Sequence, residues 1–66
     1  MKLKLDKEND AIYIRLSDSD IISSDEAGKG VILDFDEDDN VVGIEILNLS
    51  SRKNKIDLNS IQFDTA

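Results

Sequence analysis

Two neighbouring segments, VILDF (residues 31–35) and VVGIEIL (residues 41–47), place the strongest constraint on the fold. In both segments large apolar side chains occupy every second position, which is the period of a β-strand with one buried face. Setting Leu33 opposite Ile44 brings both apolar rows to the same side of an antiparallel pair. A slip of one residue would turn a whole row into water, so the pattern also predicts the register of this pair.

The predicted register has two further consequences. Phe35 lies opposite Val42, and Gly43 lies opposite Asp34. A glycine inside a strand is typical of a bulge or of a close approach by another backbone. We therefore expect the sheet to be irregular or closely packed at Gly43.

The remaining segments continue the β pattern. Residues 2–16 (KLKLDKENDAIYIRL) alternate apolar and polar side chains on both sides of a polar turn, which predicts a hairpin. Residues 21–27 (IISSDEA) are apolar only at their start and predict an exposed edge strand. The GKG at residues 28–30 predicts a turn or a bulge. Together these patterns predict a mainly β fold, a small antiparallel β-meander of about five strands.

The character of the chain changes after the last of these strands. Residues 48–55 (NLSSRKNK) are polar and basic, and Asn48 is placed to cap a single helical turn. Residues 56–63 (IDLNSIQF) carry four large apolar side chains, and their spacing fits either a short helix or a sixth strand. We expect this segment to pack on the sheet or on a second subunit. The chain is accordingly divided into a sheet domain, residues 1–51, and a C-terminal extension, residues 52–66.

Composition excludes several classes of function. The 66 residues include no Cys and no His, which removes disulfides, thiolate and imidazole metal sites and the usual general base. Fifteen acidic and eight basic residues give a formal charge of −7, which repels the phosphates of nucleic acids. The N-terminal stretch has no apolar signal region, and no apolar run is long enough to cross a bilayer. We expect a cytoplasmic protein that binds neither nucleic acid nor membrane.

The short length of the chain favours self-association. A domain of this size buries only about 60% of the surface that its unfolded chain exposes, and a sheet needs a second layer, so we expect a homodimer. Tyr13 and Arg15 are residue types common in interfaces, and Ile32 shares their face in the predicted register. With Ile61 and Phe63 of the extension they are the candidate interface residues. The alternative for Tyr13 and Arg15 is an ordinary outer-face pair in which the arginine balances an acid across the sheet.

The acidic stretch DFDEDDNVVGIE (residues 34–45) allows two interpretations. Its oxygen-bearing side chains follow the ligand order of a helix-flanked calcium loop. The candidate ligands are Asp34, Asp36, Asp38, Asn40 and Glu45. However, the flanking segments are strands, Asp39 stands where such a loop has glycine, and Glu45 lies diagonal to Asp34 at roughly 7–8 Å. We favour an acidic hairpin turn, and a calcium site is the alternative.

No catalytic site is expected. The serines have no histidine partner, and the carboxylates gather on turns and strand edges rather than in a cleft that would raise a pKa. The GKG tripeptide lacks the spacing of a phosphate-binding loop. The sequence thus predicts a non-enzymatic chain that uses no cofactor.

The quoted segments also carry a family resemblance. LDKENDAIYIRL (residues 5–16), EAGKGVILDFDEDDNVVGIEIL (residues 26–47) and the NLSS that follows resemble the domain-of-unknown-function family DUF2283 over about residues 1–51. The spacing of the acidic turn is the most specific part, although family members usually have Gly where this chain has Asp39. The resemblance implies a small prokaryotic β-rich domain with no catalytic residues to carry over. Since some relatives are thought to lie beside toxin-like genes, it also implies an acidic partner that neutralises a basic, toxin-like protein.

Overall fold

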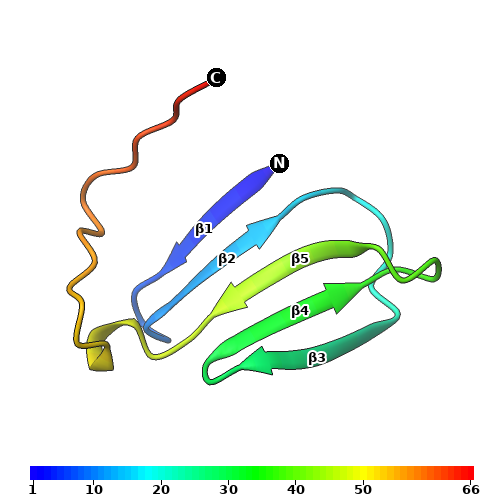
Figure 1. Cartoon of the computed structure of the whole chain (residues 1–66), viewed down its shortest axis with the longest axis horizontal. Helices are drawn as coiled ribbons and strands as arrows, with labels where there is room; N and C mark the ends of the chain where they lie inside the picture. Colours follow the sequence, from blue (N-terminus) through cyan, green and yellow to red (C-terminus); the bar gives the residue numbers. More distant parts are fainter.

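Five strands form one antiparallel sheet in the computed structural model, which describes all of residues 1–66 (Figure 1). The strands are β1 (Lys2–Asp6), β2 (Ala11–Arg15), β3 (Ser23–Gly28), β4 (Val31–Phe35) and β5 (Val41–Ile46). A single 3₁₀ turn, η1 (Leu49–Ser51), follows β5. The predicted mainly β fold of about five antiparallel strands is confirmed. The structure contains no helix that is long and apolar enough to span a membrane.

The strands are ordered β1-β2-β5-β4-β3, so the predicted meander order is wrong. β2 pairs with β5 rather than with β3, and residues 16–22 connect β2 to the far edge of the sheet (Figure 1). A meander would have left the apolar β5 at an edge and placed the polar β3 (SSDEAG) inside. The observed order instead centres the apolar strands and puts β3 at an edge, where polar and charged side chains discourage aggregation.

The predicted register of β4 against β5 is confirmed at its centre. Leu33 pairs with Ile44, and Asp34 pairs with Gly43, as the sequence predicted. At the end of β4 the register shifts, because an irregularity sets Phe35 opposite Val41, where the sequence predicted Val42. The irregularity that the strand glycine indicated therefore lies beside the turn that joins the two strands.

Residues 52–66 form neither the helix nor the sixth strand that the sequence allowed. The Asp57 carboxylate instead accepts a hydrogen bond of 2.9 Å from the backbone N–H of Asn59, which holds a local turn. A helix over so few residues is marginal, since forming its first turn is unfavourable. The extension first passes the end of the sheet at which β1 turns into β2, and its last residues lie beyond the β1 edge (Figure 1).

Little of this one-layer fold is buried. Five of the 66 residues are buried, and no large side chain is completely enclosed. A compact protein of 7.4 kDa exposes about 4,200 Å² according to the size scaling of folded monomers, whereas this chain exposes 5430 Å². The radius of gyration, 12.9 Å, also exceeds the roughly 11 Å expected for such a length. The sheet thus lacks the second layer that normally covers an apolar face.

Candidate functional site: the open face and the two charged ends of the sheet

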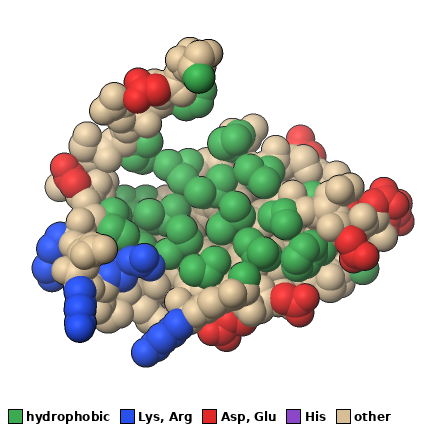
Figure 2. Space-filling view, in the orientation of Figure 1, with side chains coloured by type: hydrophobic (Ala, Val, Ile, Leu, Met, Phe, Trp, Pro, Cys, Tyr) green, Lys and Arg blue, Asp and Glu red, His purple; other side chains and the backbone are tan.

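One side of the sheet, here called the apolar face, consists of two rows of large side chains that cross four strands. The strand pairings define the first row as Leu3, Ile14, Ile44 and Leu33. They define the second row as Leu5, Ile12, Ile46 and Val31. Figure 2 shows a broad hydrophobic surface here, with charged side chains at its margin. A large exposed apolar surface with a polar rim is typical of a protein-binding site.

The C-terminal extension covers one edge of the apolar face. Ile56, Leu58 and Ile61 line a cleft of about 260 Å³ together with side chains of β1, β2 and β5. The cover is partial, because Leu58 is half-buried whereas Ile61 is 70% exposed and Phe63 is 85% exposed. Both candidate interface residues of the extension, Ile61 and Phe63, therefore lie largely in solvent in the single chain.

The opposite side, the polar face, holds a hydrogen-bonded network centred on Asp34. Strand pairing aligns Arg15, Gly43, Asp34 and Ser24 in one row across four strands. Asp34 is 8% exposed, and its carboxylate accepts hydrogen bonds from the Tyr13 hydroxyl at 3.1 Å and the Ser24 hydroxyl at 2.6 Å. A Cβ atom at Gly43 would lie 2.8 Å from both the Asp34 carboxylate and the Tyr13 hydroxyl. The glycine thus leaves room for two side chains to meet above it.

Arg15 extends this network to the segment between β2 and β3. Its Nη1 donates to the Tyr13 hydroxyl at 3.3 Å. Its Nε and Nη2 donate to the carbonyl oxygens of Ser17 at 2.7 Å and Ser19 at 2.5 Å. Tyr13 and Arg15, predicted as interface residues, are therefore engaged within the chain, and the half-buried Ile32 occupies the neighbouring row of the same face.

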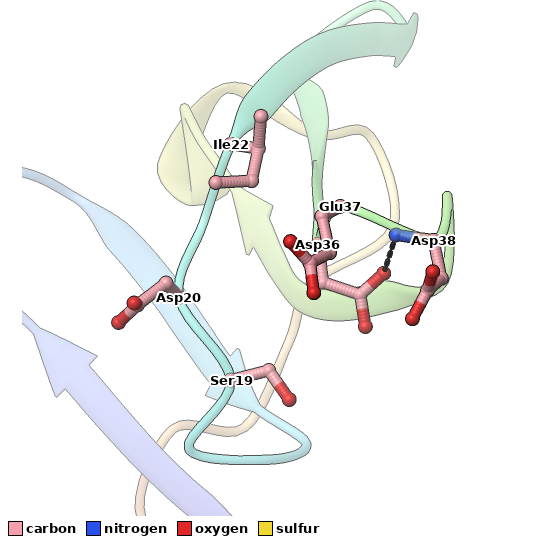
Figure 3. Close-up of a pocket in the computed structure, with 6 residues that line it drawn as sticks. All are labelled: Ser19, Asp20, Ile22, Asp36, Glu37 and Asp38. Atoms are coloured by element: carbon pink, nitrogen blue, oxygen red, sulfur yellow. Dashed lines mark hydrogen bonds between the residues drawn. The ribbon is translucent and has the colours of Figure 1, made fainter.

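The five candidate calcium ligands are not all brought together, because only Asp36, Asp38 and Asn40 share the hairpin turn. Asp34 belongs to the polar-face network, and Glu45 lies one row away. The Asp36 carboxylate holds the hairpin turn by accepting hydrogen bonds of 2.9 Å from the backbone N–H groups of Asn40 and Asp38. Figure 3 shows the bond from Asp38. The bond from Asn40, followed by that from Asp38, lowers the pKa of Asp36. No three acidic side chains of the structure are arranged to hold a metal ion.

Two loops meet at one end of the sheet, which we call the acidic end. Residues 16–22 and 36–40 contain six acidic residues and no basic residue. Their side chains line an open pocket of about 310 Å³ (Figure 3). The lining residues are Ser19, Asp20, Ile22, Asp36, Glu37 and Asp38. Asp39 has a φ of 61°, the left-handed conformation that glycine adopts most easily, which accounts for the glycine expected at this position in the resembling family.

The other end of the sheet, the basic end, is formed by three segments. Residues 7–10, 29–30 and 47–55 contain five basic and two acidic residues. In Figure 2 basic side chains gather on this side of the apolar face, and acidic side chains gather on the opposite side and also lie along the lower margin and on the extension. The charges of the loops at the two ends are therefore opposite along the direction of the strands.

Asp10 organises the basic end. Its carboxylate accepts hydrogen bonds from the Ser50 backbone N–H at 3.1 Å and the Ser50 hydroxyl at 2.8 Å. The adjoining Leu49 is 4% exposed. Asn48 occupies the N-cap position of this turn, as predicted, but its side chain makes no cap bond. The carboxylate that holds η1 thus comes from a turn forty residues earlier, which local sequence patterns do not reveal.

Comparison with known proteins gives few matches. One curated relative, from Methanosarcina mazei, is described as "Putative hypoxanthine phosphoribosyltransferase" and is 42% identical over 64 residues. The alignment covers 94% of this chain and 51% of that protein, so the chain spans about half the length of this relative. No solved structure matches the chain.

A family model gives the broader match. The family described as "Protein of unknown function (DUF2283)" matches residues 2–50, which contain all five strands and the beginning of η1. This match confirms the resemblance over about residues 1–51. Most of the chain is covered, and the chain therefore belongs to the DUF2283 family.

Proposed function

We propose that this protein is a non-enzymatic interaction domain that forms a homodimer through its apolar face. The exposed surface of the single chain carries this proposal. The 5430 Å² that it exposes exceeds the expectation for a compact monomer by on the order of 1,200 Å². This excess includes the exposed C-terminal extension as well as the apolar face, and it is larger than the roughly 800 Å² that each partner of a standard protein–protein interface contributes.

A second copy suits this face better than another occupant does. Two sheets can pack face to face with their inner side chains interdigitated, which requires apolar rows on both sheets. A second copy supplies the same rows, as a twofold interface requires. Because the charged loops stand at the margin of the face, the dimer would bury apolar side chains without burying these charges (Figure 2).

Two other roles receive less support. The name of the curated relative suggests phosphoribosyl transfer, but six acidic residues at the acidic end would repel a phosphorylated substrate. An acidic partner for a basic, toxin-like protein is favoured by the same six residues. A charged partner leaves the apolar face unexplained, so we rank that role second to self-association. A cytoplasmic location remains part of this proposal.

Adjacent residues of β1 provide a matched test. Leu3 lies on the apolar face and is 45% exposed, so Leu3→Asp should leave the single chain folded. In the dimer the new carboxylate would be buried, and we expect the dissociation constant to rise at least about a hundredfold. Lys4→Asp introduces the same side chain one residue later on the polar face and should not change dimer formation. Sedimentation velocity over a range of protein concentrations measures both effects.

The wild-type chain should sediment with a mass that rises from one chain to two as its concentration increases. Circular dichroism of both variants establishes that the sheet is retained. A wild-type chain that stays monomeric at every concentration contradicts self-association. Equal weakening by Leu3→Asp and Lys4→Asp would instead place the interface elsewhere and would contradict the role of the apolar face.

A further inference from the structure

The opposite charges at the two ends of the sheet bear on how two copies would be arranged, and this inference rests on the homodimer proposed above. The loops of the acidic end carry a formal charge of −6, and the segments of the basic end carry +3. Glu37, Asp38 and Asp39 are exposed at the first end, as are Arg52 and Lys53 at the second. Figure 2 shows basic side chains at one margin of the apolar face and acidic side chains at the opposite margin. A partner that binds the apolar face therefore meets negative charge at one end of the strands and positive charge at the other.

Two copies that pack through their apolar faces can match like ends or exchange them. If like ends match, six carboxyl groups of one copy meet six of the other, and the basic segments also meet. Like charges in contact across an interface oppose association. If the ends are exchanged, the acidic end of each copy lies over the basic end of the other. Twofold symmetry then produces this attractive contact twice.

We infer that the dimer is antiparallel, with the acidic end (residues 16–22 and 36–40) of each copy docked on the basic end (residues 7–10, 29–30 and 47–55) of the other. Two independent features of the chain support this arrangement. The apolar face supplies the contact surface between the two copies. The opposite charges at its two ends select one of the two possible orientations of the dimer. A second copy also offers both complementary ends at once, because five of its eight basic residues belong to the basic end and six of its fifteen acidic residues belong to the acidic end.

Charge reversal at each end tests the orientation. Glu37→Lys/Asp38→Lys reduces the charge of the acidic end, and Arg52→Glu/Lys53→Glu reverses that of the basic end. In the antiparallel dimer each double variant weakens four ion contacts, and we expect the dissociation constant to rise about thirtyfold. In a dimer with matched ends the same variants relieve repulsion, so the dissociation constant would fall. The two orientations thus predict effects of opposite sign in sedimentation or light scattering.

Lys4→Glu is the matched control for the single reversal Lys53→Glu. It changes the net charge by as much as Lys53→Glu, but Lys4 alternates with Leu3 and Leu5 and so projects from the polar face. We expect its dissociation constant to stay within about threefold of the wild-type value, because this charge faces away from the partner copy and is screened by solvent. High salt should weaken the wild-type dimer if opposite charges meet, and strengthen it if like charges meet.

The outcomes separate the two proposals. Weakening by both end variants, with the control unchanged, supports the antiparallel dimer. Strengthening by both, or no effect of either while Leu3→Asp still dissociates the dimer, overturns the inference and leaves self-association standing. The second result would also leave the acidic end free for a basic protein partner. A monomeric wild-type chain would overturn the proposed function itself.

Discussion

The two faces of this sheet accommodate their side chains in different ways. On the polar face the carboxylate of the nearly buried Asp34 accepts hydrogen bonds from the hydroxyl groups of Tyr13 and Ser24. On the apolar face no large side chain is completely enclosed. A hydrogen bond is a local contact that neighbouring strands of one layer can make. Removing an apolar row from water requires another layer above it, which this chain does not supply by itself.

The largest effect on the polar face is expected from removing its central carboxylate. Asp34→Ala should lower the free energy of unfolding by about 2–3 kcal/mol, because hydrogen bonds to a charged acceptor are lost and the Tyr13 hydroxyl loses its acceptor. Urea unfolding measures the loss, and Asp38→Ala, at an exposed turn position, should change stability by less than about 0.5 kcal/mol. The dimer dissociation constant should not change. If it rose as much as in Leu3→Asp, the two faces would not be independent.

A smaller loss is expected from filling the space beside that carboxylate. Gly43→Ala should destabilise the fold by about 1–2 kcal/mol, because the new methyl group would displace the Asp34 or Tyr13 side chain from their hydrogen bond. Gly28→Ala is the control, since no atom lies within 4 Å of a Cβ added there. It should be neutral or slightly stabilising, given the cost of glycine in a strand. Equal losses in thermal melts of the two variants would show that the network does not need the space at Gly43.

The smallest effect is expected at the acidic turn, which belongs to neither face. Asp39→Gly should stabilise the chain by about 0.5 kcal/mol, because glycine adopts the positive φ of this position without strain. Asp38→Gly, one residue earlier at a position without positive φ, should instead destabilise it by roughly 0.5–1 kcal/mol. Thermal melts of the pair test this. A loss of stability in Asp39→Gly would mean that the aspartate side chain contributes more than the backbone conformation does.

The strands and the register of β4 against β5 could be predicted because both depend on alternation within short segments. Leu33 opposite Ile44 follows from the requirement that both apolar rows lie on one side. The strand order could not be predicted in this way. The choice of β5 rather than β3 as the neighbour of β2 is a competition between segments far apart in the chain. Local periodicity contains no information about its outcome.

The polar-face network was only partly accessible from the sequence. Tyr13 and Arg15 were predicted as interface residues from their residue types. The predicted register also placed Gly43 opposite Asp34. The missing partner was Ser24, which reaches Asp34 because β3 pairs with β4 at the edge of the sheet. The same limitation applies to Asp10, whose carboxylate holds Ser50. Contacts of this kind arise when the sheet brings distant segments together.

By itself the sequence determined which segments are strands, which of their sides is apolar, and how the two most apolar strands align. These features follow from the two-residue period of an extended backbone and from the cost of exposing apolar side chains. The tertiary structure decided the strand order, the partners of Asp34 and Asp10, and the separation of acidic and basic loops to opposite ends. Each of these depends on which distant segments share an edge or an end of the sheet, and that arrangement is chosen by the packing of the whole chain.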